Sequence, residues 1–308
     1  MTPEPLFSIG MKIILASARL LAVALLCVGA RIACADDAGA SLRAKYDALQ
    51  NRLSQNQFQR PLYLESSETP DRVTGDIYAR LDYPFATVSA ALDNPGDWCE
   101  ILILHVNTKY CRASSGSRGA VLNVSIGKKY DEPLEKAYRV DFAYRVAAQT
   151  ANYLQVRLNA DAGPFSTRDY RIVLEAVPLE PGRTFMHFSY SYSYGTVGRL
   201  AMQAYLATIG RNKVGFGVVE TRSGGERVHI GGMRGLVEQN TKRYYCAVAA
   251  FLRSGLAPPQ ERLEKRLREW FAAIERYPRQ LHEMEQGQYL EMKRKEHLRQ
   301  QSALPPPA

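Results

Sequence analysis

The sequence predicts an α+β fold in which a run of antiparallel strands is followed by one long helix. Apolar and polar residues alternate with a period of two in several segments between residues 138 and 194, which is typical of strands with one covered face. Short turns at residues 161–164 and 180–182 separate these segments and favour antiparallel neighbours. Residues 232–255 carry an apolar stripe with helical spacing, which predicts a helix of about six turns.

The amino end has the pattern of a secretory signal peptide. An apolar run at residues 20–30 is shorter than the roughly 20 residues that a membrane-spanning helix needs. Residues 33–35, Ala-Cys-Ala, then provide the small side chains that a signal peptidase accepts. We expect a signal peptide over residues 1–35, a mature chain that begins near Asp36, and export to the periplasm or the medium. The alternative to cleavage is that this segment stays on the protein as an N-terminal anchor helix. A separate open point is the first residue, since translation that begins at Met11 would give the same signal pattern.

The first elements of the mature chain are a helix and two strands. Residues 36–60 predict an amphipathic helix that docks on the main domain. Its apolar stripe consists of Leu42, Tyr46, Leu49 and Leu53. Residues 62–66 and 73–85 predict strands. Residues 86–102 predict helical pieces that are interrupted at residues 94–96, Asn-Pro-Gly.

Three cysteines remain after the expected cleavage, so at most one disulfide and one free thiol are available. Cys99 and Cys111 are close in sequence, and a bridge between them would stabilise the fold by roughly 3 kcal/mol. Cys246 falls within the predicted long helix, where we expect a buried, inert thiol. The five histidines are far apart and no Cys/His spacing resembles a metal site, so the sequence predicts neither a metal nor another cofactor.

The chain is moderately basic, with a formal net charge of +9. Basic residues are mixed with acidic ones along the chain instead of gathering in one segment, so the charge pattern predicts no nucleic-acid partner. A transient contact with anionic membrane surfaces is the milder expectation from this charge.

Tyrosine is frequent on the apolar faces of the predicted strands. The segment at residues 184–194 shows the strongest alternation, with aromatic residues and Met186 on one face and His187 and serines on the other. A tyrosine ring contributes apolar area while its hydroxyl needs a partner when buried. Such an interior suits a ligand with scattered polar groups, or ordered water. Plain core filling is the alternative at each of these tyrosines.

Two further segments surround the long helix. Residues 195–210 predict a short amphipathic helix bounded by glycines, and residues 213–220 predict a further strand. Residues 258–302 are rich in charge and have a helical stripe, which we expect to pack on the chain's own domain. Residues 303–308 are expected to be disordered.

Two stretches of the sequence carry a resemblance to a known superfamily. GDIYARLDYPFATVSAAL (residues 75–92) looks like a first strand leading into a first helix, and GGMRGLVEQNTKRYYCAVAAFL (residues 231–252) looks like a long gripping helix. The chain thus resembles the START-like, or helix-grip, superfamily, with the domain placed at residues 61–257. The resemblance implies a curved sheet wrapped around the helix and a cavity for an apolar or amphipathic ligand. Members bind lipids, sterols, quinones or polyketides, and a minority are enzymes.

This resemblance leads us to expect an exported binding or carrier protein for a hydrophobic or amphipathic small molecule such as a lipid. Asn240 on the long helix is an expected headgroup contact, and Arg234 is a weaker one. The expected cavity residues are Tyr138, Phe142, Tyr144, Tyr170, Met186, Phe188, Tyr190, Tyr192 and Asn240. The expected lid residues are Met202, Tyr205 and Leu206.

Two other functions remain open at this point. The first is an enzyme of the same fold, although strand carboxylates such as Asp169 and Glu175 fall on predicted outer faces and no G-x-S-x-G motif occurs. Glu238 or His187 would become candidates if the register were shifted by one residue, since that shift inverts the faces of a strand. The second is an envelope adaptor that binds its partner through residues 258–302.

Overall fold

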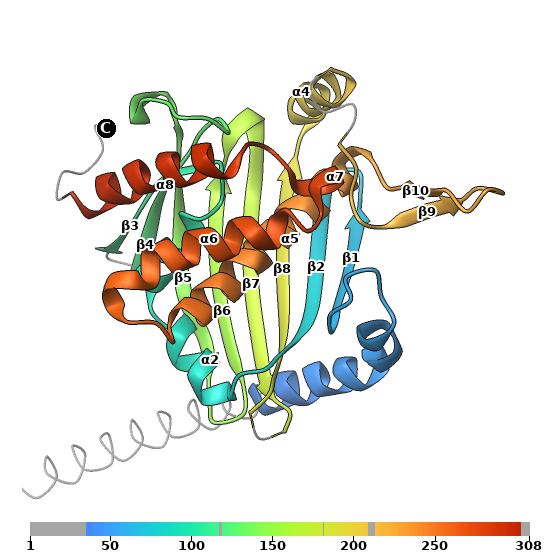
Figure 1. The fold of residues 1–308 in the computed structure, drawn as a ribbon, viewed down its shortest axis with the longest axis vertical. Coiled ribbons are helices and arrows are strands. Elements are labelled where there is room, and N and C mark those ends of the chain that lie inside the picture. The colour runs from blue at the N-terminus through green and yellow to red at the C-terminus, as the bar shows by residue number, and fades with distance from the viewer. Residues whose placement is uncertain (1–34, 117–118, 181, 209–212, 303–308) are drawn as a thin grey trace, which may run out of the picture.

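The computed structural model describes residues 35–116, 119–180, 182–208 and 213–302. Its centre is one antiparallel sheet in the spatial order β1-β2-β8-β7-β6-β5-β4-β3, which curves around the long helix α5 (Gly232–Ser254) (Figure 1). The strands are β1 (Leu62–Glu68), β2 (Arg72–Leu81), β3 (Thr108–Gly116), β4 (Gly119–Ile126), β5 (Tyr138–Gln149), β6 (Leu154–Ala162), β7 (Thr167–Pro178) and β8 (Thr184–Tyr194). The predicted α+β fold is confirmed.

Strand pairing places the apolar residues of the alternating segments on the concave face. Phe188 of β8 lies opposite Leu174 of β7 on one side and opposite Ile77 of β2 on the other. All three side chains are buried. The register is fixed by this pattern, because a shift of one residue would turn the apolar set outward.

Helices α2 (Phe85–Leu92) and α3 (Pro95–Leu102) connect β2 to β3 and are separated where the sequence predicts a break. The side-chain oxygen of Asn94 accepts a hydrogen bond from the Gly96 backbone N–H at 2.7 Å, which caps α3. Pro95 suits the first position of this helix because a backbone N–H there would have no partner within the helix.

The disulfide Cys99–Cys111 ties the end of α3 to β3, with the two Cα atoms 5.1 Å apart. This confirms the pairing that the sequence predicts. Cys246 is the free thiol of the described residues, and it is buried in α5 as expected.

Helix α5 crosses the concave face in contact with β1, β2 and β8 (Figure 1). Gly75 of β2 permits this approach: a Cβ atom there would lie 2.4 Å from Thr241 Oγ1 and 3.3 Å from the Val237 carbonyl oxygen. Any larger residue would push the helix away from the strand. The distance between sheet and helix at this end is therefore set by a single glycine.

The C-terminal segment folds back on the same domain. It forms α6 (Arg262–Ile274), α7 (Pro278–Leu281) and α8 (Gln286–Gln301). Trp270 of α6 is buried against α5, where its Nε1–H donates to the Arg243 carbonyl oxygen at 3.0 Å. Its ring also stacks on Tyr289 of α8, with centroids 4.9 Å apart. The apolar stripe of α6 is thus covered by this chain itself.

Buried charges hold α8 on β3. The carboxylate of Glu296 accepts from Lys109 Nζ at 2.9 Å and from Lys293 Nζ at 2.7 Å, and all three side chains are at most 1% exposed. Lys293 also donates to the backbone oxygens of His105 and Thr108 at 2.6 and 2.8 Å. Burial lowers the pKa of Lys293 to about 8. We call Lys109, Lys293 and Glu296 the α8 charge cluster.

The N-terminal helix (residues 35–54) covers part of the convex face of the sheet, where it forms a second, smaller core with β2, β7 and β8 (Figure 1). The buried members of this core are Ala35, Leu42, Leu49, Leu53, Tyr78, Tyr153, Val177 and Phe185. The sequence predicts solvated outer faces, and for this part of the sheet that prediction is wrong. The reason is that Tyr78, Val177 and Phe185 give the outer face its own apolar patch.

Two insertions lie between β8 and α5. Helix α4 (Thr196–Ala207) follows β8 directly, and the hairpin of β9 (Val218–Thr221) and β10 (Arg227–His229) projects from the body of the molecule (Figure 1). The outer end of the hairpin is exposed, including Val219, which is 61% exposed.

The predicted strand at residues 213–220 exists only in its second part. The backbone N–H groups of Phe216 and Gly217 donate to the Glu238 carboxylate at 2.6 and 2.8 Å, so they are not available to a strand partner. Glu238 also accepts from Ser66 Oγ at 2.6 Å. This glutamate therefore fastens α5 to β1 and to the segment before β9.

Single 3-10 turns occur at η1 (Leu134–Lys136), η2 (Pro164–Ser166) and η3 (Pro259–Glu261). Within the part of the chain that the structure describes, no helix has both the length and the apolar character needed to cross a bilayer. The expected signal sequence, apart from residue 35, and the expected disordered end at residues 303–308 lie outside the described residues.

Candidate ligand site

Aromatic side chains occupy the space between the concave face of the sheet and α5. The ring centroid of Tyr190 lies 5.3 Å from that of Tyr244 on α5. On the other side of Tyr190, the rings of Tyr192 and Tyr170 lie 5.8 and 6.3 Å away. We call the following residues the aromatic cluster: Phe142, Tyr170, Phe188, Tyr190, Tyr192 and Tyr244. Its members meet because each strand directs every second residue to the concave face.

Three hydroxyl groups of the aromatic cluster have no protein partner among the described residues. The hydroxyl of Tyr170 forms a hydrogen bond with Thr167 Oγ1 at 2.6 Å, but no such bond involves Tyr190, Tyr192 or Tyr244. Burial raises their pKa values, which keeps the hydroxyls protonated at neutral pH. The interior thus offers three hydrogen-bonding positions within an apolar surround.

The structure brings most of the expected cavity residues together on the concave face, where Phe142, Tyr144, Tyr170, Met186, Phe188, Tyr190 and Tyr192 are buried. Tyr138 differs, because it lies at the start of β5 and is 44% exposed. Arg234 donates to the Ser66 carbonyl oxygen at 2.8 Å and is thereby engaged with β1. Met202 packs against the main core, whereas the side chains of Tyr205 and Leu206 lie outside the described part. The role of these residues in binding stays a prediction.

His105 and Asn240 form a polar end to the aromatic cluster. The His105 ring stacks on Tyr244 with centroids 4.9 Å apart. Its Nδ1 accepts from the Asn107 backbone N–H at 3.2 Å, which places the imidazole proton on Nε2. Burial and neighbouring positive charges lower the pKa of His105 well below 6.5, so the ring is neutral. Its Nε2–H is buried and makes no hydrogen bond of good geometry within the described part, although the side chain of Asn240 lies close enough to oppose the lowering of the His105 pKa.

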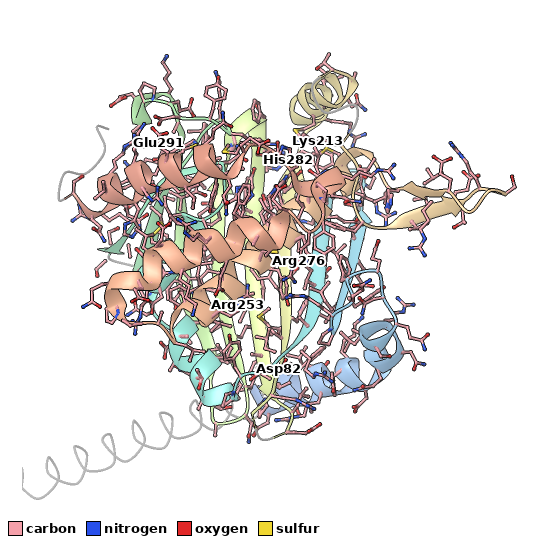
Figure 2. All side chains as sticks on the ribbon, in the orientation of Figure 1. Asp82, Lys213, Arg253, Arg276, His282 and Glu291 are labelled. Atoms are coloured by element: carbon pink, nitrogen blue, oxygen red, sulfur yellow. A yellow bond between two sulfur atoms is a disulfide. The ribbon has the colours of Figure 1, made fainter. Side chains whose placement is uncertain are left out.

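Three cationic side chains converge on Glu283 near this polar end. Lys129 Nζ, Lys213 Nζ and Arg243 Nη2 lie 2.5, 2.8 and 2.6 Å from the same oxygen, Oε1 of Glu283. Figure 2 shows Lys213 beside His282, the residue before Glu283. We call these four residues the Glu283 cluster. It joins the segment after β4, the segment after α4, helix α5 and the connection between α7 and α8.

The ionisation of the Glu283 cluster follows from its burial and its excess of positive charge. Burial alone would raise the pKa of Glu283, but Arg243, Lys129 and Lys213 outweigh it and hold that pKa below its ordinary value. Burial, followed by the charge of Arg243, lowers the pKa of Lys129 to about 7. The sequence does not predict this cluster, because its members are far apart in the chain and lie largely in connecting segments.

A second polar group, partly buried, lies on the convex face beside Tyr78 of the smaller core. His187 Nε2 is 2.9 Å from Asp76 and its Nδ1 is 2.9 Å from Glu175. Its ring stacks on Tyr78 with centroids 4.4 Å apart. Although burial opposes it, hydrogen bonds to both carboxylates raise the pKa of His187 to about 9. Both ring nitrogens are engaged, so this histidine holds the sheet and lacks a nitrogen for proton transfer to a substrate.

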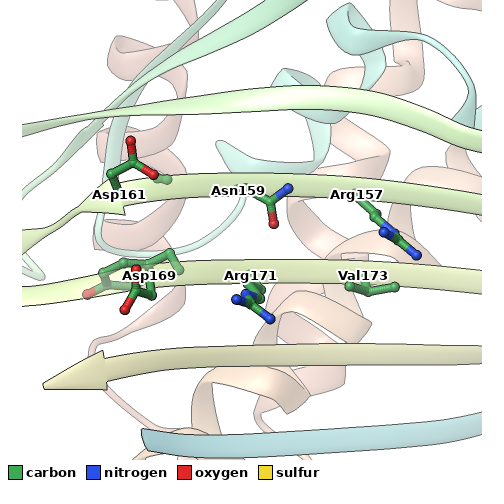
Figure 3. A pocket seen from close by; sticks show the side chains of 8 residues that line it. Arg157, Asn159, Asp161, Asp169, Arg171 and Val173 are labelled. Carbon is green, nitrogen blue, oxygen red and sulfur yellow. The ribbon is translucent and has the colours of Figure 1, made fainter. Parts of the chain in front are cut away.

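Two hollows of the described surface lie outside the space between the sheet and α5, and one of them is lined in part by Tyr170 of the aromatic cluster. The larger, about 480 Å³, is an open groove on the convex face of β6 and β7, with Arg157 and Arg171 in its lining (Figure 3). The second, about 270 Å³, lies beside the N-terminal helix near Arg60. The open cavity beside α5 that the resemblance implies stays a prediction; the structure shows aromatic rings packed against one another there.

Comparisons with known proteins give similarity at the level of structure. No protein-family profile and no curated protein matches the chain. A truncated norcoclaurine synthase from Thalictrum flavum is 14% identical, and the match covers 47% of this chain and 90% of that one with a TM-score of 0.32. A START superfamily protein from Mycobacterium smegmatis is 13% identical over 46% of this chain and 92% of that one, with a TM-score of 0.30. The Zhui aromatase/cyclase of Streptomyces sp. R1128 is 10% identical over 63% of this chain and 98% of that one, with a TM-score of 0.33.

The order of the elements identifies the fold. Strand β2 leads into α2 and α3, and six further antiparallel strands return the chain until β8 pairs with β2. Helix α5 then lies across the concave face of that sheet. The additions are the N-terminal helix, β1, the two insertions before α5, and α6 to α8. The chain therefore has a helix-grip fold, a curved antiparallel sheet around a long helix.

Proposed function

We propose that this protein is an exported binding or carrier protein for a hydrophobic or amphipathic small molecule, such as a lipid, held between the concave face and α5. The observation that carries the proposal is the aromatic cluster, an apolar interior with three tyrosine hydroxyls that lack protein partners. Burial of an alkyl chain there would contribute roughly 0.8 kcal/mol per CH₂ group. The hydroxyls would bind polar groups of the same molecule.

Entry of such a ligand requires movement, because the rings are in contact with one another. Tyr190 and Tyr244 must change their side-chain conformation, or α4 must shift away from the sheet end that it borders. Helix α4 contacts η2, β8 and α5, which places it where a lid over this end would have to hinge. This geometry supports α4 as the lid.

Native mass spectrometry tests the proposal directly. Protein purified from a bacterial periplasm should carry a bound molecule or should gain the mass of a lipid when lipid extracts are added. Repeated recovery of the empty protein, with no mass change on addition of extracts, would count against a carrier function.

A substitution inside the aromatic cluster should reduce binding. Tyr190→Trp adds ring volume and removes one free hydroxyl, so we expect the affinity for a pyrene-labelled fatty alcohol to fall about tenfold. Fluorescence titration measures this affinity, and circular dichroism checks that the variant is folded. Tyr130→Trp is the matched control, since Tyr130 is 57% exposed. Equal affinities of the two variants would place the ligand elsewhere.

The same proposal includes export. The signal pattern of residues 1–35 supports it, and so does the Cys99–Cys111 disulfide, because disulfides persist mainly in oxidising compartments. After expression of the full chain in a Gram-negative host, amino-terminal sequencing of the periplasmic fraction should give a start near Asp36. Recovery of the uncleaved chain in the membrane fraction would instead support the anchor-helix alternative.

A further inference from the structure

We propose that the Glu283 cluster is an anion-binding site that receives the carboxylate or phosphate headgroup of an amphipathic ligand whose apolar body lies against the aromatic cluster. The inference rests on the proposed binding function and specifies its chemistry: the ligand is an anionic amphiphile. Three observations carry the inference: the charge of the cluster, its unused donors, and its place beside the aromatic cluster.

The Glu283 cluster gathers two lysines and an arginine around one carboxylate in a largely buried place. The side chains of Lys129, Lys213 and Arg243 are 29%, 20% and 2% exposed, and that of Glu283 is 8% exposed. Among the described residues, Glu283 is the sole ion-pair partner of both lysines. A further anion at this place would stabilise the charged forms of Lys129 and Lys213.

Lys129 and Lys213 also have N–H donors that the described residues do not use. An ammonium group offers three N–H donors, and the hydrogen bonds of the described residues use one from Lys129 and one from Lys213, both to Glu283. Both side chains retain some exposure, so an incoming anion can reach them. A carboxylate or phosphate oxygen fits this arrangement because charge-assisted hydrogen bonds to anions are among the strongest in proteins.

His105 gives an independent indication of a ligand. Its neutral ring is only 4% exposed, and its Nε2–H makes no hydrogen bond of good geometry among the described residues. The side chain of Asn240 interacts with this imidazole but does not complete a hydrogen bond of good geometry, so a ligand oxygen would satisfy the buried donor better. The ring stacks on Tyr244, and Asn240 Oδ1 accepts from Arg243 Nη1 at 3.5 Å on the same helix. His105 and Asn240 therefore lie between the aromatic cluster and the Glu283 cluster.

The spatial order of these groups, from the aromatic cluster through His105 and Asn240 to the Glu283 cluster, matches the structure of an anionic amphiphile. The aromatic cluster would contact the apolar body, and His105 and Asn240 would bind polar atoms next to the headgroup. The cations of the Glu283 cluster would bind the charged end. Glu283 itself would share these cations with the ligand anion, or would give them up to it.

The experiment compares two probes that differ in one group, pyrenedecanoic acid and pyrenedecanol, by fluorescence titration. We expect the full-length mature protein to bind the acid at least about tenfold more tightly than the alcohol, the size of effect typical of a hydrogen bond to a charged group. In Lys213→Gln the affinity for the acid should fall about tenfold while that for the alcohol changes little. Thermal melting followed by circular dichroism confirms that this variant is folded.

Lys128→Gln is the matched control, because it removes the same charge from an exposed lysine adjacent in sequence to Lys129. If Lys128→Gln and Lys213→Gln lose the same affinity for pyrenedecanoic acid, the loss comes from long-range charge, and the proposed anion site is contradicted. Equal affinity for acid and alcohol would also overturn it while leaving the binding function intact. Absence of binding of either probe would contradict the binding function itself.

Competition separates the two sources of the anion. Dodecanoate and dodecyl phosphate should each displace pyrenedecanoic acid, and the stronger competitor identifies the headgroup. Inorganic phosphate alone should displace it only weakly, because it lacks the apolar body. If inorganic phosphate competes as well as dodecyl phosphate, the site binds free phosphate and the headgroup assignment is overturned.

Discussion

Replacement of Glu296 by glutamine is expected to lower the free energy of unfolding by roughly 3–5 kcal/mol. This carboxylate is the only negative group in the α8 charge cluster, where it lies 2.9 Å from Lys109 Nζ and 2.7 Å from Lys293 Nζ. The variant leaves two ammonium groups buried without a counter-charge. Urea denaturation, followed by circular dichroism, measures the loss.

Glu291→Gln provides the control for this effect on the same helix. Glu291 pairs with Lys295 at 2.9 Å, but its side chain is 69% exposed, so we expect a change of at most about 0.5 kcal/mol. Similar values for the two variants would mean that the α8 charge cluster is not what holds α8 on β3. Because α8 is fastened through Lys293 to the backbone of His105, the loss should extend to the polar end of the aromatic cluster.

The sheet and the long helix follow from local patterns in the sequence, and this is why they were predictable. Alternation with period two at residues 184–194 predicts which side chains of β8 face the helix, and the pairing of Phe188 with Leu174 confirms it. The apolar stripe at residues 232–255 predicts α5 almost to the residue. Asn94 and Pro95 predict the break between α2 and α3 because their effects are local to a helix start.

The covering of the convex face was not predictable in the same way. Tyr78 and Phe185 interrupt the polar outer faces of their strands, and each taken alone is an ordinary exposed aromatic residue. They form a core only because the N-terminal helix packs on them with Leu42 and Leu49. The sequence shows an apolar stripe on one helix and scattered apolar residues on two strands, but it does not show that these surfaces pack against each other.

The candidate site was predicted in its apolar half and missed in its polar half. Tyr190 and Tyr192 are marked by strand alternation, since a strand repeats every two residues. Glu283, Lys129 and Lys213 lie in connecting segments, where no periodicity says which way a side chain points. Even for the apolar half, alternation predicts the direction of a side chain but not how closely the rings pack against one another.

Replacement of His187 by glutamine is expected to lower the free energy of unfolding by roughly 2–3 kcal/mol at neutral pH and to change its pH dependence. The pKa of His187 rises from 6.5 to about 9 because the hydrogen bonds and charges of Asp76 and Glu175 outweigh burial. Since this pKa is raised in the folded state, the stabilisation is complete below pH 6.5 and is lost as the pH rises through 9. The variant should lack this decline.

At acidic pH, the dependence of the free energy of unfolding on pH is set by Glu175. Burial would raise the pKa of this carboxyl, but hydrogen bonds from His187 and Tyr153 lower it from 4.5 to about 2. Its stabilisation is therefore present above pH 4.5 and is lost as the pH falls towards 2. Together the two groups give their largest contribution between pH 4.5 and 6.5.

Urea denaturation at a series of pH values measures this profile, and NMR titration of the imidazole gives the pKa of His187 independently. His282→Gln serves as the control, because that side chain is 43% exposed and its ion pair with Glu275 should change stability by at most about 0.5 kcal/mol. A His187 resonance that titrates near its ordinary value, or a His187→Gln variant with the wild-type profile, would show that the imidazolium does not bind the two carboxylates.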